Sequence, residues 1–484
     1  MQRKLGQIGG MSLLIAWIIV SVLMAASGSA SVLRPEIAPF TASINPVVGR
    51  DDQITAPPAV APVKDYEAIS LFGRKLVSPA PDPAALQQYE QARRDFAAGP
   101  TEDNFIWLGR RTAYLGRYRE AISIYSEGLK KFPASYRLLR HRGHRYISTR
   151  QFDRAVADFE KAAALVQGKP LEVEPDGTPN KAGKPVSNTQ FNIYYHLGLA
   201  HFLTRSFTKA EAAYRECLRW SKNDDSVVAV TDWLYMTLRR TGQTSAAAKA
   251  LAPIHRGLKL IEDGAYLDRL LMFMGEISED AYAKERPEET APEKAIRSYG
   301  LGLTRLWRGD KAGARELFDV LVMSGNWASF ATIAAEAELA DLVRFDPDRR
   351  SVGSALTAWS LSWNIYDLDL AGKLFVSGPQ TTYFSSEKPG RIQGFEALME
   401  HHRGFGFVSN GKTADNRLWL EDCTIQEDAA MAYVTARWFF DRDVAGPGPV
   451  QKGPVTFVLM RGNDGWKIGH AHFANDPVVP AAAK

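Results

Sequence analysis

The chain has 484 residues, of which 45% are hydrophobic and 24% are charged, and its formal net charge is +4. This composition is typical of a soluble globular protein, and the length allows two or three domains, each with its own core. A net charge this small does not indicate nucleic acid as a partner. The two cysteines, Cys217 and Cys423, fall in different expected domains and favour two buried thiols over a disulfide framework.

The first thirty residues have the pattern of an export signal. Arg3 and Lys4 precede an uncharged apolar run over residues 11–26, and Gly28-Ser29-Ala30 offers small residues for cleavage. The run is shorter than the roughly 20 residues that span a bilayer, which favours a cleaved signal peptide over residues 1–30. We therefore expect export to the periplasm. The alternative is an inner-membrane anchor formed by residues 11–26, and membrane contact is expected only in that case.

Two segments separate this signal from the first repeat. Residues 31–66 are rich in Pro and Ala and lack any helical or alternating pattern, so they are expected to form an extended tether. Asp82-Pro83 has the pattern of an N-cap followed by proline in a first helical turn, and Gly99-Pro100 ends the helix. We expect a leading helical cap over residues 67–101.

A 34-residue repeat follows, with units at 102–135 and 136–169. A helical hairpin of this kind buries its apolar face only against its neighbours, so stacked units form a solenoid with an open groove. The shift places Gly109 on Gly143, Tyr118 on Phe152, Ala121 on Ala155 and Tyr125 on Phe159.

The residue order of the first unit resembles the tetratricopeptide repeat family. A third unit begins near Phe191, after an insertion of turn-forming residues over 168–188. A weaker unit surrounds Gly242, a degenerate one is expected around 255–290, and a clear one contains Gly302. About six repeats are thus expected in an all-α solenoid over residues 102–345. The residues that carry the resemblance are Leu108-Gly109, Gly116, Tyr118, Ala121, Tyr125, Leu129 and Pro133.

The pattern changes after residues 346–353, which are expected to form a linker. A helix over 354–375, a strand holding Tyr383 and a helix over about 395–403 precede a run of strands, and residues 477–484 form a tail. Helices followed by a curved antiparallel sheet predict a smaller α+β cone over 354–476. The expected strands cover residues 416–424, 430–441, 454–461 and 465–473.

The order of these elements and the closing segment from Asp464 to Ala474 (DGWKIGHAHFA) resemble the SnoaL-like branch of the nuclear transport factor 2-like superfamily. The resemblance implies a pocket between sheet and helices, and some members are isomerases, cyclases or hydratases. His470 and His472 are expected to share a strand face with Trp466 and Ile468, because alternate residues point the same way. The pocket candidates are Trp363, Tyr383, His401, Arg437, His470 and His472.

The tetratricopeptide resemblance implies that side chains near the central glycine of each first helix face the groove. The resulting set is basic, aromatic and amide-bearing, which suits a carboxylate or a peptide C-terminus held by charge-assisted hydrogen bonds. The alternative is a solvated face whose Arg and His side chains pair internally with Asp and Glu. The groove candidates are Trp107, Arg110, Arg137, Arg140, His141, His144, Asn192, Tyr195, His196, Asp232, Trp233, Arg239 and Arg240.

Neither a metal nor a cofactor is expected. His141, His144 and His196 could offer three imidazoles to zinc, but neighbouring arginines such as Arg142 and Arg145 oppose a dication. An acid–base pair of histidines beside Arg437 is conceivable in the cone, but no carboxylate is placed as a general base.

We therefore predict an exported interaction scaffold that binds a protein or peptide in the solenoid groove, with a C-terminal domain that forms a homodimer or holds a small ligand. The alternative is an enzyme with its pocket in the cone.

Overall fold

The structure is a computed structural model that describes residues 64–177, 180, 182–444, 446 and 448–477. The expected signal peptide, almost all of the expected tether and most of the expected tail lie outside the described residues.

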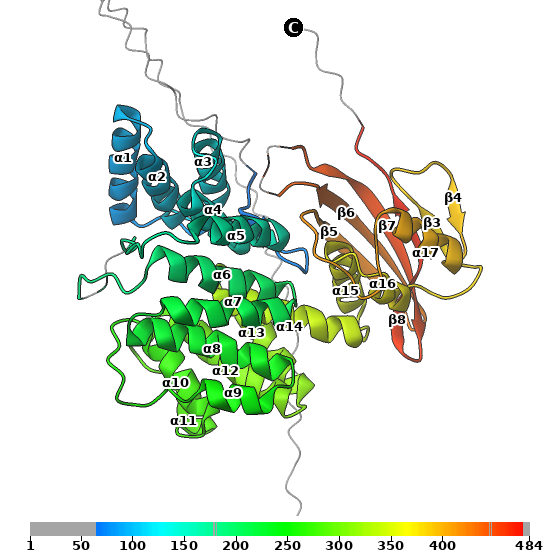
Figure 1. The fold of residues 1–484 in the computed structure, drawn as a ribbon. Coiled ribbons are helices and arrows are strands. Elements are labelled where there is room, and N and C mark those ends of the chain that lie inside the picture. Colours follow the sequence, from blue (N-terminus) through cyan, green and yellow to red (C-terminus); the bar gives the residue numbers. More distant parts are fainter. Residues whose placement is uncertain (1–63, 178–179, 181, 445, 447, 478–484) are drawn as a thin grey trace, which may run out of the picture. The chain divides into compact units, whose positions relative to one another are not determined.

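Six consecutive helix pairs follow a leading helix and form the predicted all-α solenoid (Figure 1). The central glycine of the first helix recurs because the second helix crosses it at contact distance. A Cβ on Gly109 would lie 2.2 Å from the Tyr125 ring, and one on Gly198 would lie 2.4 Å from Tyr214. The helices are α1 (Pro83–Ala98), α2 (Glu102–Tyr114), α3 (Tyr118–Lys131), α4 (Tyr136–Ser148), α5 (Phe152–Val166), α6 (Thr189–Leu203), α7 (Phe207–Trp220), α8 (Asp224–Arg240), α9 (Thr244–Ala250), α10 (Gly264–Phe273), α11 (Glu279–Ala283), α12 (Ala291–Trp307) and α13 (Lys311–Met323).

One further helix, α14 (Phe330–Phe345), is buried on nearly every side. It contacts α6, α12 and α13 of the solenoid and α15 and α16 of the following domain. A helix that is apolar all round must lie inside a core rather than on a surface. Helix α14 thus packs on the last helix pair, as its place in the sequence predicts, and it also reaches α6 in the middle of the solenoid, which the sequence pattern does not predict.

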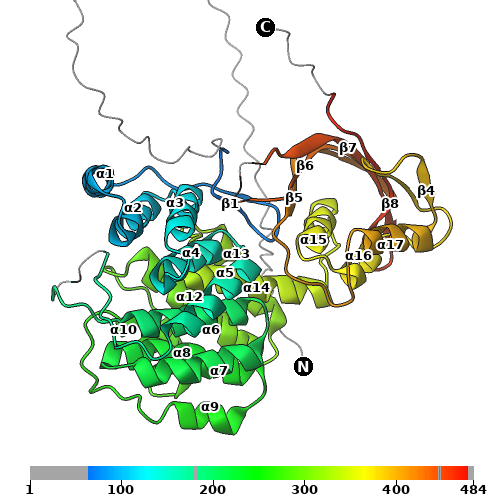
Figure 2. The same cartoon turned by 45° about the horizontal axis from the view of Figure 1, so that its top comes forward.

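The C-terminal part is the expected α+β cone, with a curved sheet that wraps around α15 in Figure 2. The strand order is β4-β3-β8-β7-β6-β5, and every pairing is antiparallel except β3 with β8, which is parallel. The elements are α15 (Val352–Asn364), α16 (Leu368–Leu374), β3 (Thr382–Phe384), β4 (Arg391–Gln393), α17 (Phe395–Gly404), β5 (Arg417–Glu427), β6 (Met431–Asp441), β7 (Gln451–Gly462) and β8 (Gly465–Phe473).

The single helix expected over 354–375 is wrong, because the chain breaks between α15 and α16. Tyr366 adopts a φ of 48°, and Asp367 caps the new helix by accepting a hydrogen bond from the Leu370 N–H at 2.9 Å. A residue in the left-handed region cannot continue a right-handed helix. The expectation for the cysteines is half right: Cys217 is buried, but Cys423 is exposed on β5.

Residues 64–78 form a hairpin segment, with β1 (Ala68–Ile69) paired to β2 (Lys75–Leu76), that joins the solenoid to the cone. The Trp327 Nε1–H donates to the Val77 carbonyl at 2.9 Å, and the Tyr66 hydroxyl donates to Asp441 on β6 at 2.7 Å. Side chains from both parts form one continuous buried core that runs from Leu71 to Phe473.

Candidate functional site

The thirteen groove candidates are not open to solvent. Eight are buried and five are half-buried, and none is exposed. Two acidic segments of the chain itself cover part of this set: a loop covers candidates of the first units, and helix α14 contacts His144, His196 and Arg240. The half-buried five are Trp107, Arg137, His144, Arg239 and Arg240.

The first cover, here called the acidic loop, is residues 171–177 of the inserted segment. It runs extended along the start of α6, where Val173 forms a β-bridge with Asn188. Extended backbone points alternate side chains the same way, which places the acids Glu172 and Glu174 together on one side. The loop therefore presents both carboxylates to α4.

Two of the three acids of the loop, Glu172 and Glu174, each meet a basic residue of α4. Arg137 reaches Glu172 at 3.0 Å, and Arg140 reaches Glu174 at 3.0 Å. The Arg111 guanidinium of α2 donates to the Gly177 carbonyl at 2.7 Å. Burial lowers the pKa of Arg140, and the nearby Glu174 opposes this effect. The first half of the groove thus binds carboxylates at present, and they belong to the chain itself.

Two predicted side chains complete this half of the groove. The Arg110 guanidinium lies 4.6 Å from the Trp107 ring centroid, a cation–π arrangement. His141 stacks on Tyr125 at 5.9 Å, and its pKa lies well below the usual value because it is buried and surrounded by arginines.

The second cover is α14, whose carboxylates meet three arginines of the solenoid. Arg150 donates to Glu336 at 2.8 Å, Arg205 donates to Glu338 at 2.9 Å, and Arg240 donates to Glu338 at 2.8 Å. Asp341 accepts from both Arg205 and Arg240. Burial alone would raise the pKa of Asp341, but these arginines outweigh it and lower the pKa.

Arg150 and Arg205 were not among the predicted site residues, although the repeat contains the signal that identifies them. Arg150 lies one 34-residue period after Gly116, at the turn between the two helices of a unit. Gly116 has a φ of 75°, Arg150 63° and Arg205 61°. An arginine in the left-handed region, where glycine is the usual residue, indicates a side chain held by strong partners.

At the N-terminal end of α14, the contacts are between histidine and aromatic rings rather than between charged groups. The His144 and His196 rings are 4.6 Å apart, and Phe330 of α14 lies 5.1 Å from His144. Burial holds the pKa of both histidines well below the usual value, and the arginines of α4 add to the shift. His141 is not part of this pair, so the three imidazoles do not converge as a zinc site would require.

The remaining groove candidates are structural contacts in the described chain. Asp232 forms a buried ion pair with Arg269, and Asn192 donates to the Ser187 hydroxyl at 3.0 Å. Trp233 packs edge-on against Phe202, and Arg239 lies over the Trp307 ring at 4.3 Å. Tyr195 stacks on Phe191 at 5.4 Å. Internal pairing with acids, the alternative stated for this face, therefore accounts for Arg137, Arg140, Asp232 and Arg240.

In the cone, Trp363 and Tyr383 do line a common cavity, but its volume is only about 30 Å³. That volume corresponds to about one water molecule. Aromatic rings fill the remaining space: Trp363 lies 4.9 Å from Phe407 and 5.3 Å from His402. His402 is fully buried and was not predicted, and burial lowers its pKa to about 4. The half-buried His401 lies beside Tyr383 at 5.5 Å.

His470 and His472 do not face this cavity, contrary to the expectation of a face shared with Trp466 and Ile468. The register slips between β7 and β8, where Leu459 pairs with Ile468 but Val458 pairs with His470. The extra residue is Gly469, and a β-bulge of one residue sends all later side chains to the opposite face. His470 consequently pairs with Thr382 at 2.7 Å. Arg437 also lies away from the cavity and binds Asp476.

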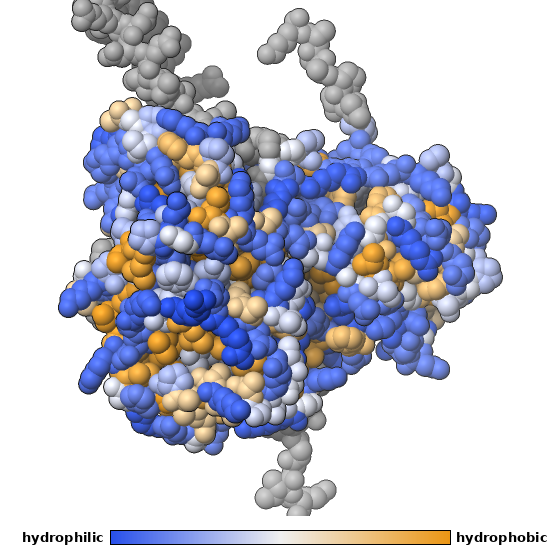
Figure 3. Space-filling view, viewed as in Figure 1, coloured by the Kyte–Doolittle hydropathy of each residue, from blue (hydrophilic) through white to orange (hydrophobic). Residues whose placement is uncertain are grey.

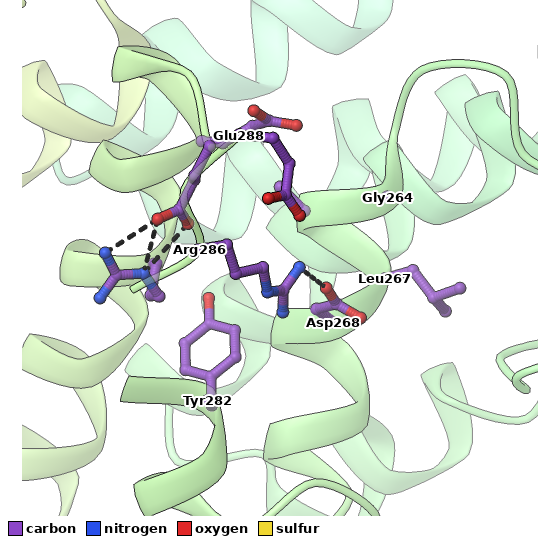
Figure 4. A pocket seen from close by; sticks show the side chains of 10 residues that line it. Gly264, Leu267, Asp268, Tyr282, Arg286 and Glu288 are labelled. Atoms are coloured by element: carbon purple, nitrogen blue, oxygen red, sulfur yellow. Dashed lines mark hydrogen bonds and ion pairs between the residues drawn. The ribbon is translucent and has the colours of Figure 1, made fainter. Parts of the chain in front are cut away.

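A separate pocket of about 240 Å³ lies between α10, α11 and α12 (Figure 4). The Tyr282 hydroxyl points toward it, and Arg286 pairs there with Asp268. Arg297 also lines the pocket and pairs with Glu289. None of the predicted site residues lines this pocket, and both arginines already have carboxylate partners.

The stacked helix pairs place the protein among helical-repeat proteins, which typically bind partners on an extended concave surface. Residues 191–224, the α6–α7 unit, match the tetratricopeptide repeat family. A comparison with curated proteins finds no match.

Solved structures of the nuclear transport factor 2-like superfamily are similar to part of the chain. A superfamily protein from Salmonella enterica serovar Typhimurium is 19% identical, with 27% of this chain and 92% of that chain covered and a TM-score of 0.22. A protein of unknown function from Pseudomonas putida is 13% identical, with 28% and 89% covered and a TM-score of 0.24. One from Shewanella oneidensis is 17% identical, with 25% and 93% covered and a TM-score of 0.21.

No helix among the described residues combines the length and the apolar character that crossing a bilayer requires. The apolar run at residues 11–26 lies outside the described residues. Figure 3 shows hydrophobic residues at the surface of the helical repeats, interspersed with hydrophilic ones.

Proposed function

We propose that the protein is an exported interaction scaffold whose first solenoid units bind a carboxylate-bearing peptide segment of another protein in place of the acidic loop. The observation that supports this proposal is the acidic loop itself, an extended segment whose Glu172 and Glu174 each meet an arginine of α4. A groove that holds one acidic strand in this geometry can hold another of the same chemistry.

Of the two covering segments, the acidic loop is the one that a peptide can displace. Leu171 is 44% exposed and Val173 is 58% exposed, so the loop buries little apolar surface. In α14, by contrast, Glu336 and Glu338 are almost fully buried and the helix shares the main core. Exchange of α14 would open that core, so the peptide site of the proposal is confined to α2 and α4.

A synthetic peptide that copies residues 170–177 (PLEVEPDG) tests the proposal as a fluorescent probe in anisotropy titrations. In the wild-type chain the tethered loop competes at millimolar effective concentration, so binding should be weak. Glu172→Gln with Glu174→Gln should raise the affinity at least tenfold, and adding Arg140→Gln should remove the gain. A matched Lys161→Gln change on α5 should leave binding unaltered. The proposal fails if the loop variant does not bind the peptide, or if it binds a peptide with Gln and Asn in place of the acids equally well.

For the cone we propose a homodimer contact on the outer face of the sheet. Met431 and Met460 pair across β6 and β7 on that face and are 46% and 45% exposed, with Tyr433 beside them at 44%. The inner cavity is too small for a ligand larger than water, which favours association over ligand storage. Sedimentation of the full chain with Met460→Lys tests this contact.

A further inference from the structure

A third cavity, here called the joint cavity, lies where the solenoid meets the cone, and its volume is about 150 Å³. The solenoid contributes Arg205 and the α14 residues Asp341 and Arg344. The cone contributes the end of α15, residues 410–414 and Arg417. The joint cavity has about five times the volume that one water molecule occupies in the liquid.

The lining of the joint cavity carries more positive than negative charge. Arg205, Arg344, Lys412 and Arg417 line it, against the single carboxylate of Asp341. The two solenoid arginines of the lining, Arg205 and Arg344, also pair with carboxylates just outside it. Glu338 pairs with Arg205 and with Arg240, and Asp367 pairs with Arg344 at 2.6 Å. After these pairs are formed, neither Lys412 nor Arg417, the two cations from the cone, has a direct ion pair with a carboxylate of the described residues. The carboxylates of Glu336, Asp415 and Asp153 act on Arg417 only from a longer distance.

Arg417 is the more unusual of the two, because its side chain is buried at 2% exposure. Its guanidinium donates only to backbone carbonyls: those of Asn416 at 2.7 Å, of Arg150 at 2.6 Å, and of Ala414. Its Nε–H has no acceptor in the described chain. Burial lowers the pKa of Arg417 to about 10, yet it stays charged at neutral pH. A buried charge without a direct ion pair is costly, so an anion that contacts it is favourable.

Lys412 supplies a second, accessible cation at the same cavity. Its ammonium lies 5.2 Å from the Tyr366 ring centroid, and its backbone N–H donates to the Ile365 carbonyl at 2.7 Å, which fixes the loop. The next two residues, Thr413 and Ala414, also line the cavity, and their backbone N–H groups donate to no described residue. Ammonium, guanidinium and free amide groups together are typical of an oxyanion site.

We propose that the joint cavity binds a small oxyanion, held by Lys412 and Arg417 from the cone and lying beside Arg205 of the solenoid. Phosphate and the carboxylate of a small organic acid share this chemistry, and the cavity has room for either with one or two waters. Because the ligand contacts both parts of the chain, its binding stabilises their contact.

The test is a titration of the full chain with inorganic phosphate, and separately with succinate, followed by calorimetry and thermal unfolding at constant ionic strength. Either anion should raise the melting temperature of the wild-type chain above that in chloride. Phosphate alone identifies a phosphate site, and succinate alone identifies a carboxylate site. Lys412→Glu should weaken binding at least tenfold without unfolding the chain, because its side chain is exposed.

Lys388→Glu is the matched control, since Lys388 is also an exposed lysine in a loop of the cone. It should leave the affinity within about twofold of the wild-type value, well inside one tenfold step. No rise in melting temperature with either anion, or an equal rise in the Lys412→Glu chain, would overturn the proposal.

Discussion

At the scale of single residues, Arg150 and Arg205 adopt a strained backbone conformation, and their ion pairs with α14 compensate for the strain. A non-glycine residue in the left-handed region costs on the order of 1 kcal/mol, which other units avoid with Gly116, Gly242 and Gly309. Each arginine recovers this cost only because a carboxylate of α14 meets it. These turns therefore select the helix that packs against them.

Removing one of the α14 carboxylates that pair with these arginines should strongly lower the stability of the fold. Glu336→Ala leaves the Arg150 guanidinium buried and unpaired, since the two side chains are 2% and 1% exposed. We expect the free energy of unfolding to fall by about 3–5 kcal/mol, measured by urea denaturation. Glu400→Ala is the control: its partner Arg403 is 50% exposed, and an exposed pair contributes at most about 1 kcal/mol. Equal losses in the two variants would contradict the argument.

The residue scale also shows where sequence reasoning stops. The sequence correctly predicts that His470 and His472 lie on one face of β8, but not which face. The face depends on the β-bulge at Gly469, and nothing in the strand pattern indicates that extra residue. Arg150 and Arg205 could have been found, because they break a glycine position of an established period.

At the scale of elements, the repeat pairs were predictable because each depends on contacts within one 34-residue unit. The position of α14 was not, because it results from ion pairs between segments more than one hundred residues apart. The break of the cone's first helix at Tyr366 was also missed, since the aromatic stripe continues across it.

The two histidines packed against α14, His144 and His196, should make the folded protein less stable at acidic pH. Burial holds the pKa of His144 and His196 well below about 6.5 in the folded chain, while both titrate near 6.5 when unfolded. Below pH 6.5 the unfolded state binds more protons, so stability falls as the pH falls. Each histidine should contribute about 1.4 kcal/mol per pH unit between pH 6.5 and the folded value.

Replacing His144 by Phe should remove one such contribution from the slope of unfolding free energy against pH between 7.5 and 5.0. The phenyl ring keeps the contact with Phe330 and takes no proton. His472→Phe is the control, because His472 is exposed on β8. An unaltered slope in His144→Phe, or an equal decrease in the control, would show that α14 does not depend on neutral histidines.

At the scale of the whole molecule, the described solenoid and cone should unfold together, because one core runs through both and the hairpin segment closes it. Asn364 connects three backbone groups there: it donates to the Leu71 carbonyl at 3.1 Å and to the Leu418 carbonyl at 3.0 Å, and it accepts from the Leu418 N–H at 2.6 Å. This linkage could not be predicted from either pattern, since the repeats and the cone were each recognised separately.

Asn364→Ala leaves these three buried groups without partners, at a cost of about 1–3 kcal/mol each. Scanning calorimetry should show one transition for the wild-type chain, with equal calorimetric and van 't Hoff enthalpies, and two for the variant. Asn416→Ala is the control, since Asn416 bonds the Tyr366 hydroxyl within the cone. If Asn364→Ala still unfolds in one transition, Asn364 is not required for the coupling of the two parts.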